Sequence, residues 1–166
     1  MDHITSKKRE LVSVDEEWKK KDTPYKTASK EDLISSVEPR DRTKTKLWQI
    51  LKNWCISTGS KVFTNIHDDT YQKFSIWCLK TKTIKQDLED EGFKQTENWK
   101  DKAVAFKDKG KNSDSSFITP SDKSEVKEND IKTWCTNNEA QSFRHEADQT
   151  YLRVKKWCYE QKKTIT

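Results

Sequence analysis

The chain has 166 residues, of which 31% are hydrophobic and 37% are charged, and its 33 basic and 28 acidic side chains give a net charge of +5. This composition lies close to that of disordered chains, but seven Trp, six Phe and four Tyr provide enough large side chains for a small core. The two signs of charge are mixed along the chain, which argues against the clustered cations of a nucleic-acid-binding surface.

No segment approaches the roughly 20 consecutive apolar residues of a membrane-spanning helix, so no integral membrane segment is predicted. The first residues, Met1 to Arg9, lack the apolar core of a signal peptide, and no export signal is predicted in the sequence as it stands. With only three Gly and three Pro, and with few alternating apolar and polar runs, the sequence predicts an all-α fold.

An internal repeat organises the sequence. The segment Lys52–Cys78 recurs 80 residues later without a gap, and a fixed period of this kind indicates duplication. The repeat predicts two tandem helical modules of about 80 residues, at 12–82 and 93–166, after a disordered N-terminus at 1–11. The matched residues are Lys52, Trp54, Cys55, Phe63, Asp68, Thr70, Tyr71, Trp77 and Cys78, paired with Lys132, Trp134, Cys135, Phe143, Asp148, Thr150, Tyr151, Trp157 and Cys158.

The first module is predicted to open with a short helix near Val14. Ser13 and Glu16 have the spacing of a capping box, in which each side chain satisfies a free backbone N–H. Further along, Leu47, Ile50, Leu51 and Trp54 follow the i, i+3, i+4, i+7 spacing of an apolar helical stripe. This second helix is expected to end near Gly59.

A later helix is predicted to start after Asp68 in the first module and after Asp148 in the second. Tyr71, Phe74 and Cys78 share one face of the first of these helices. Tyr151, Val154 and Cys158 share a face of the second helix. Phe63 and Phe143 each stand alone in a polar connector (56–67 and 136–146), where an aromatic residue typically covers a small core. The predicted structural core is Trp54, Trp77, Trp134, Trp157, Tyr71, Tyr151, Phe63 and Phe143.

A helix at 83–92 is predicted to join the modules. Thr83 and Gln86 again have capping-box spacing, and Gly92 is a typical residue at a helix end. The segment 107–125 is rich in Lys, Asp and Ser, and it is predicted to be a flexible loop anchored by Phe117 and Ile118.

The four cysteines form two pairs with the same spacing, Cys55 with Cys78 and Cys135 with Cys158. Three interpretations are open. A disulfide in each module would close a loop of about 24 residues and stabilise it by about 3 kcal/mol. Reduced cysteines could instead pack as small apolar groups beside Trp. A metal site is the third interpretation, but it normally needs close pairs such as C-x-x-C. We predict the disulfides, although four cysteines allow three pairings.

No catalytic site, cofactor site or metal site is predicted. The sequence has no phosphate-binding Gly-rich loop, no H-E-x-x-H motif and no nucleophile elbow. His67 and His145 do not occupy equivalent positions in the two copies, which argues against a duplicated ligand. Tryptophan side chains could stack on nucleobases, but tryptophans at helical spacing are far more often core residues.

The Trp-Cys modules Leu51-Lys-Asn-Trp-Cys55 and Val154-Lys-Lys-Trp-Cys158 resemble those of the paralogous, uncharacterised protein families of haemotropic mycoplasmas. The segment Trp77–Phe93 and the following Trp99-Lys100 carry the same resemblance. The resemblance implies a surface or secreted protein with a host-facing, antigenically variable role. It implies no catalytic residue. Members of these families often begin with an apolar segment rich in Gly and Ala, from which this sequence departs.

From these observations we expect a non-enzymatic binding or antigenic module. Its partner could be a host macromolecule, but the sequence does not identify it. The alternative is a cytoplasmic, basic helical protein associated with nucleic acid. The two hypotheses differ in the expected thiol state, because an exported module should be oxidised and a cytoplasmic one reduced. A hydrolase of unrecognised type is a weaker third hypothesis.

Overall fold

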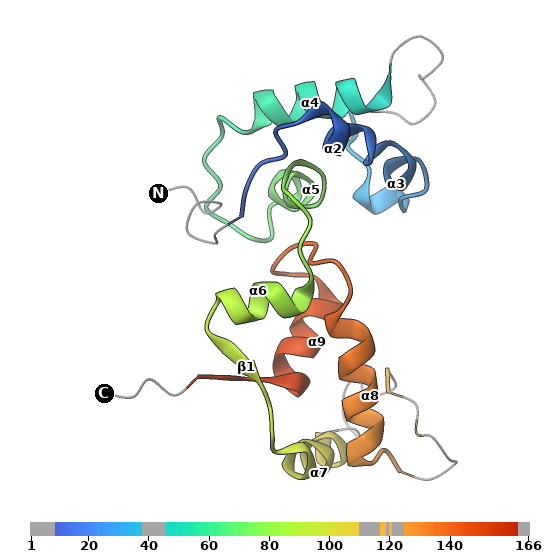
Figure 1. Ribbon diagram of the computed structural model, residues 1–166, viewed down its shortest axis with the longest axis vertical. Helices are drawn as coiled ribbons and strands as arrows, with labels where there is room; N and C mark the ends of the chain where they lie inside the picture. The colour runs from blue at the N-terminus through green and yellow to red at the C-terminus, as the bar shows by residue number, and fades with distance from the viewer. Residues whose placement is uncertain (1–8, 38–45, 110–116, 119, 121–124, 163–166) are drawn as a thin grey trace. The chain divides into compact units, whose positions relative to one another are not determined.

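The computed structural model describes residues 9–37, 46–109, 117–118, 120 and 125–162, and Figure 1 shows the arrangement of their helices and strands. The chain divides into two compact units. Unit 1 comprises Met1–Thr81 and Arg144–Ala147, and unit 2 comprises Lys82–Phe143 and Asp148–Thr166. The predicted joining helix falls in unit 2, and the short segment Arg144–Ala147 belongs to unit 1.

Unit 1 is built around a pair of longer helices. Its core contains α4 and α5, which lie against each other, and the short helix α2 packs on α4 (Figure 1). Leu11 forms an isolated antiparallel bridge with Leu79, so the start of the described chain is tied to the end of α5. The elements are α2 (Asp15–Lys19), α3 (Asp22–Lys26), η1 (Lys30–Asp32), α4 (Leu47–Thr58) and α5 (Asp69–Cys78).

Unit 2 also contains a central helix pair, α8 and α9, and α7 lies against α8 (Figure 1). A two-stranded antiparallel sheet joins the start of the unit to its end, with Lys94 opposite Glu160 in the register. The elements are α6 (Ile84–Asp90), β1 (Phe93–Gln95), α7 (Trp99–Lys109), α8 (Glu128–Glu139), α9 (Gln149–Cys158) and β2 (Tyr159–Gln161).

Polar side chains fix the starts of three of these helices. Asp68 accepts a hydrogen bond from Tyr71 N at 2.9 Å, and Asp148 accepts one from Tyr151 N at 3.3 Å. Thr83 and Gln86 form the predicted reciprocal capping box. These bonds satisfy backbone N–H groups that have no partner within the helix.

Gly92 follows the end of α6 with a φ of +88°, in the left-handed region where a side chain would be strained. This agrees with the predicted helix end at that residue.

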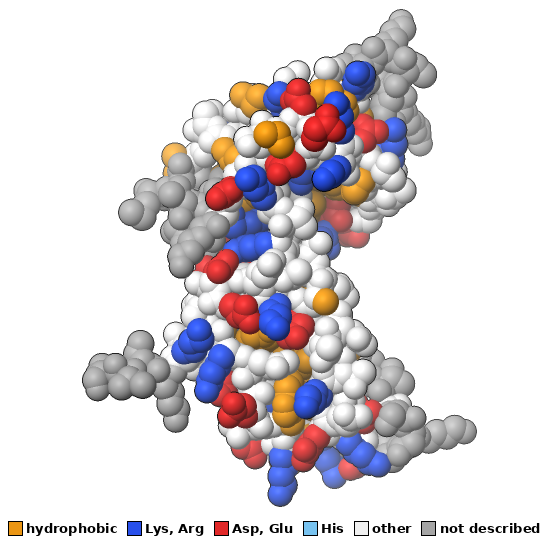
Figure 2. Space-filling model, in the orientation of Figure 1, with side chains coloured by type: hydrophobic (Ala, Val, Ile, Leu, Met, Phe, Trp, Pro, Cys, Tyr) orange, Lys and Arg blue, Asp and Glu red, His pale blue; other side chains and the backbone are white. Residues whose placement is uncertain are grey.

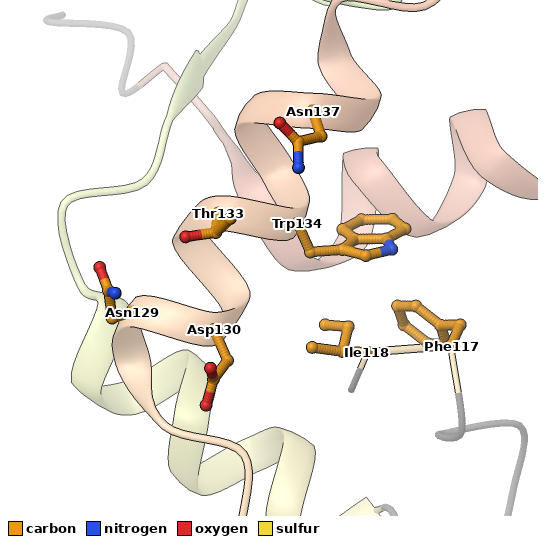
Figure 3. Close-up of a pocket in the computed structure, with 7 residues that line it drawn as sticks. All are labelled: Phe117, Ile118, Asn129, Asp130, Thr133, Trp134 and Asn137. Atoms are coloured by element: carbon orange, nitrogen blue, oxygen red, sulfur yellow. The ribbon is translucent and has the colours of Figure 1, made fainter. Parts of the chain in front are cut away.

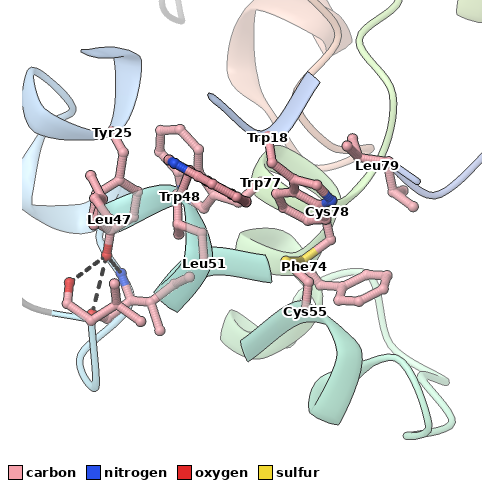
Figure 4. Packing of buried hydrophobic residues seen from close by; sticks show 13 residues of the cluster. Trp18, Tyr25, Leu47, Trp48, Leu51, Cys55, Phe74, Trp77, Cys78 and Leu79 are labelled. Atoms are coloured by element: carbon pink, nitrogen blue, oxygen red, sulfur yellow. Dashed lines mark hydrogen bonds between the residues drawn. A yellow bond between two sulfur atoms is a disulfide. The ribbon is translucent and has the colours of Figure 1, made fainter. Parts of the chain in front are cut away.

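Each unit has its own buried cluster. In unit 1 the sulfurs of Cys55 and Cys78 lie among Leu51, Phe74 and Trp77, as Figure 4 shows. In unit 2 the cluster contains Ile131, Cys135, Val154, Trp157 and Cys158 among its buried members. The cores are small and rich in aromatic residues, as the composition predicts.

The described residues are mostly helical, and they depart from the all-α prediction in the two-stranded sheet of β1 and β2 and in two isolated bridges. The strands have three residues each, and such short strands carry no alternating pattern that sequence analysis could detect. The first residue of β2, Tyr159, is buried, with only 3% of its surface exposed.

Three local predictions were wrong. Helix α2 begins at Asp15 with Val14 as its N-cap, and no side chain caps it, so the Ser13 capping box is absent. The N-terminus was predicted to be disordered over residues 1–11, of which residues 1–8 lie outside the described residues. Arg9, however, is buried and hydrogen-bonded to Ser75. The predicted loop at 107–125 begins too early, because α7 continues to Lys109. Much of the rest of that loop lies outside the described residues.

An ion pair in unit 2 yields a stability prediction. Asp87 is fully buried, and its Oδ1 lies 2.8 Å from Lys82 Nζ, whose side chain is 13% exposed. Removing one partner of a buried ion pair leaves a charge without compensation, which typically costs about 3 kcal/mol or more. We therefore expect Lys82→Met to lower the free energy of unfolding by about 3 kcal/mol in chemical denaturation.

Lys85→Met is the matched control, because Lys85 is an exposed lysine of α6, the helix that carries Asp87. It should change the free energy of unfolding by less than about 0.5 kcal/mol. The double variant Lys82→Met/Asp87→Leu should recover most of the loss, because no buried charge remains. Equal stability of Lys82→Met and the wild type would show that the pair does not compensate a buried charge.

Candidate functional site

The structure brings the four cysteines together in the pairs that the repeat suggests. Cys55 and Cys78 form one disulfide, with a Cα–Cα distance of 5.5 Å, and Cys135 and Cys158 form the other, with a distance of 5.7 Å. Each bond connects two helices of one unit that lie against each other, α4 with α5 and α8 with α9. All four residues are at most 4% exposed. The sulfurs therefore lie in the cores, where they can staple a helix pair.

Two of the four tryptophans that precede these cysteines, Trp77 and Trp157, pack against an aromatic residue of a preceding helix. Trp77 meets Tyr25 edge to face at 4.8 Å between ring centroids, and Trp157 meets Phe106 in the same manner at 5.1 Å. Trp77 Nε1 also donates a hydrogen bond of 2.7 Å to Asp32 O. Trp77 and Trp157 are buried, whereas Trp54 and Trp134 are partly buried on the surfaces of the cores.

The remaining predicted core residues lie around the start of α5 and α9. Phe63 contacts Tyr71 at 5.5 Å, and Phe143 contacts Tyr151 at 4.9 Å between ring centroids. Tyr71, Tyr151 and Phe143 are buried, and Phe63 is partly buried. Each connector aromatic therefore covers the first turn of the following helix in its own unit.

Several buried ionisable groups escaped the sequence analysis. Arg9 donates hydrogen bonds to both the hydroxyl and the carbonyl oxygen of Ser75. Tyr71 Oη donates to the buried Glu146, at 2.8 and 2.9 Å from its two carboxylate oxygens. These residues belong to polar stretches, so hydropathy gave no signal that they are buried.

In unit 2, Tyr159 Oη donates a hydrogen bond of 2.8 Å to Glu139 Oε2. Burial and the neighbouring Glu139 carboxylate raise the pKa of Tyr159 above its usual range. The phenol therefore remains a hydrogen-bond donor across the physiological pH range.

A cavity of about 400 Å³ lies along α8 in unit 2, and Figure 3 shows the side chains around it. Its volume falls within the usual range for small-molecule sites, about 300–1,000 Å³. Three uncharged polar residues, four positions apart and thus on one helix face, line it: Asn129, Thr133 and Asn137. All three are exposed. The remaining lining residues are Phe117, Ile118, Asp130 and Trp134.

The apolar side of this cavity is held in place by ring contacts. The rings of Phe117 and Trp134 lie 4.9 Å apart at an angle of 61°. Phe117 also contacts Phe106 edge to face at 5.4 Å, and the Arg153 guanidinium lies 4.4 Å from the Phe117 ring centroid. These contacts give the cavity a preformed aromatic wall.

Among the described residues that line the cavity, Asp130 carries the one carboxyl group. It is 8% exposed, and one of its oxygens accepts a hydrogen bond of 2.8 Å from Lys127 N at the start of α8. Across the residues that the structure describes, no group of three or more His, Cys, Asp or Glu side chains is arranged to hold a metal ion.

No protein-family model, no curated protein and no solved structure matches this chain. Within the described part of the chain, no helix has the length and apolar character needed to cross a bilayer. The site must therefore be interpreted from its own chemistry.

Removing a disulfide should weaken one unit. We expect Cys135→Ala/Cys158→Ala to lower the stability of unit 2 by about 3 kcal/mol, because the unfolded chain loses its cross-link. Hydrogen exchange measures this by region, and protection should fall in α8 and α9. The matched variant Cys55→Ala/Cys78→Ala should lower protection in α4 and α5. Unchanged protection in both variants would contradict a stapling role.

Lys21 gives a prediction about pH. Burial lowers the pKa of Lys21 from 10.5 to about 8, and repulsion from the positive charge of Arg9 is a smaller cause of the same shift. Between these values the unfolded state binds more protons than the folded state, so this group makes stability rise as pH increases. Lys21→Met should be more stable than the wild type at pH 7, by about 3 kcal/mol at most. The difference should shrink towards pH 10 in denaturant titrations, and a difference independent of pH would rule out this origin.

Proposed function

We propose that this protein is a non-enzymatic binding module, exported from the cell, in which two copies of a disulfide-stapled helical unit carry exposed recognition surfaces. The observation that carries the proposal is the burial of both disulfides. Structural disulfides form and persist in oxidising environments and are rare in reducing cytosol. By the resemblance in sequence to the families of haemotropic mycoplasmas, the surface would face a host and vary antigenically.

Paired contacts in the two units support a tandem duplication. The helices α4 and α8 have 12 residues each, and α5 and α9 have ten residues each. Offsets of 80 or 81 residues also relate the two disulfides, the caps Asp68 and Asp148, and the ring pairs of Trp77 and Trp157. Duplication of one unit explains why two distant parts of the chain have the same disulfide, helix cap and ring contact.

Surface charge gives little support to the alternative of nucleic-acid association. Lys19, Lys26 and Lys52 each have a carboxylate oxygen within 2.8 Å. Figure 2 shows Lys and Arg side chains interspersed with Asp and Glu side chains on the visible face of each unit. Lysines already paired with carboxylates release fewer counterions on contact with phosphates, so they contribute less to nucleic-acid affinity.

The export proposal can be tested in intact cells of the source organism. Cells are treated with a protease that does not enter them, and free thiols are then alkylated in denaturant at the moment of lysis, so that buried thiols also react. We expect the protein to be digested or found in the medium, with all four cysteines protected from the alkylating reagent. A cytoplasmic enzyme serves as the control and should stay intact. Protection of the protein from protease together with four alkylated cysteines would contradict export.

A further inference from the structure

We propose that the cavity along α8 binds a neutral saccharide. The inference rests on the proposed function, since it assigns a ligand class to the binding module. The cavity has one polar side and one aromatic side, and both belong to unit 2 (Figure 3). A sugar ring has the same two-sided character, with hydroxyl groups at its rim and C–H groups on its faces.

The polar side matches hydroxyl groups rather than ions. Asn129, Thr133 and Asn137 carry no charge, although 37% of the chain is charged. Amide groups present both a donor and an acceptor, and so do the hydroxyl groups of a sugar. Spacing by four residues places the three side chains about one helical turn apart. Four residues of helix rise about 6 Å, so the row can contact hydroxyl groups on neighbouring rings of one oligosaccharide.

The aromatic side matches the C–H faces of a sugar ring. The face of an aromatic ring is negative, so it attracts the slightly positive hydrogens of C–H groups. Trp134 is partly buried, and the neighbouring Phe117 and Ile118 complete the wall. Because ring contacts already fix Phe117 and Trp134, little side-chain freedom would be lost on binding.

Asp130 adds an acceptor to the cavity lining. Its carboxylate is held by Lys127 N at the first turn of α8. A hydroxyl group that donates to a carboxylate forms a stronger hydrogen bond than one that donates to a neutral group. An anionic ligand would instead be repelled by this carboxylate, so the lining favours a neutral saccharide over an acidic one.

The helix α4 has the same kind of row in unit 1. Gln49, Asn53 and Ser57 are exposed, uncharged and four residues apart, at positions 80 residues before Asn129, Thr133 and Asn137. The residue types differ between the two rows, but all six side chains are amides or hydroxyls. The two helix faces therefore share their capacity to form hydrogen bonds, although they do not share the same residues.

The test is an NMR titration of the full-length, oxidised protein labelled with ¹⁵N. The probes are the neutral disaccharides lactose, maltose and N,N′-diacetylchitobiose, with glucuronate as the anionic comparison and adenosine monophosphate as the rival stacking ligand. We expect at least one neutral disaccharide to shift the amide signals of Asn129, Asn137 and the Trp134 indole in a saturable manner. Glucuronate and adenosine monophosphate should leave them unchanged.

Two variants sharpen the test. Thr133→Ala and Asn137→Ala should each weaken saccharide binding about tenfold, because each removes a hydrogen bond to the ligand. Thr136→Ala is the matched control, an exposed threonine of the same helix outside the cavity lining, and it should bind as the wild type does. All three residues are exposed, so the variants should fold.

The proposal is overturned if no neutral disaccharide shifts these signals, or if Thr133→Ala and Asn137→Ala bind as the wild type does. It is also overturned if adenosine monophosphate shifts the same residues, which would indicate a nucleotide site. Failure here with both disulfides intact and the protein outside the cell would leave the proposed function standing. Four reduced cysteines in an intracellular protein would instead contradict the proposed function.

Discussion

The structure depends on a cross-link between two helices, made once in each unit. The disulfides join α4 to α5 and α8 to α9, and they lie within small cores in which aromatic and aliphatic residues are present in similar numbers. A unit of roughly 80 residues buries a smaller share of its surface than a large domain does, so hydrophobic burial alone leaves it marginally stable. Restricting the unfolded chain by a covalent loop supplies part of the missing free energy.

This arrangement leaves outer helix faces available for the recognition role that we propose. Because the staple and the rings of Trp77 and Trp157 hold each helix pair, the outer faces of α4 and α8 need not contribute to the core. Those faces carry neutral amides and hydroxyls in a chain that is otherwise highly charged. In unit 2 the exposed row borders an aromatic wall, and the two together form the cavity that we assign to a saccharide.

The sequence predicted several helices and part of the core from periodicity, whereas the capping-box spacing was right at Thr83 and wrong at Ser13. The apolar face of α5, the Thr83 capping box and the helix end at Gly92 follow from side-chain spacing and backbone chemistry, and the structure confirms them. The sheet of β1 and β2 was missed because its strands are too short to alternate. Arg9 was missed because its burial depends on Ser75, which is 66 residues away.

The cavity could not have been predicted, since its aromatic wall combines residues from separate segments. Trp134 was expected in the core, whereas Phe117 and Ile118 belong to a stretch rich in Ser and Asp that indicates a loop. Only tertiary packing brings Phe117 to the side of α8, and no local pattern encodes that contact. The four-residue spacing of Asn129, Thr133 and Asn137 can be read from the sequence. Their role in a binding site depends on the aromatic residues beside them, which only the fold supplies.

The claim that each unit is held by its own disulfide is tested most directly by mapping which cysteines are paired. Protein isolated from its native source under non-reducing conditions, with free thiols blocked at once, is digested and its linked peptides are identified by mass spectrometry. The account predicts one linked peptide containing Cys55 and Cys78 and another containing Cys135 and Cys158. Four free thiols, or links between the two units, would contradict it.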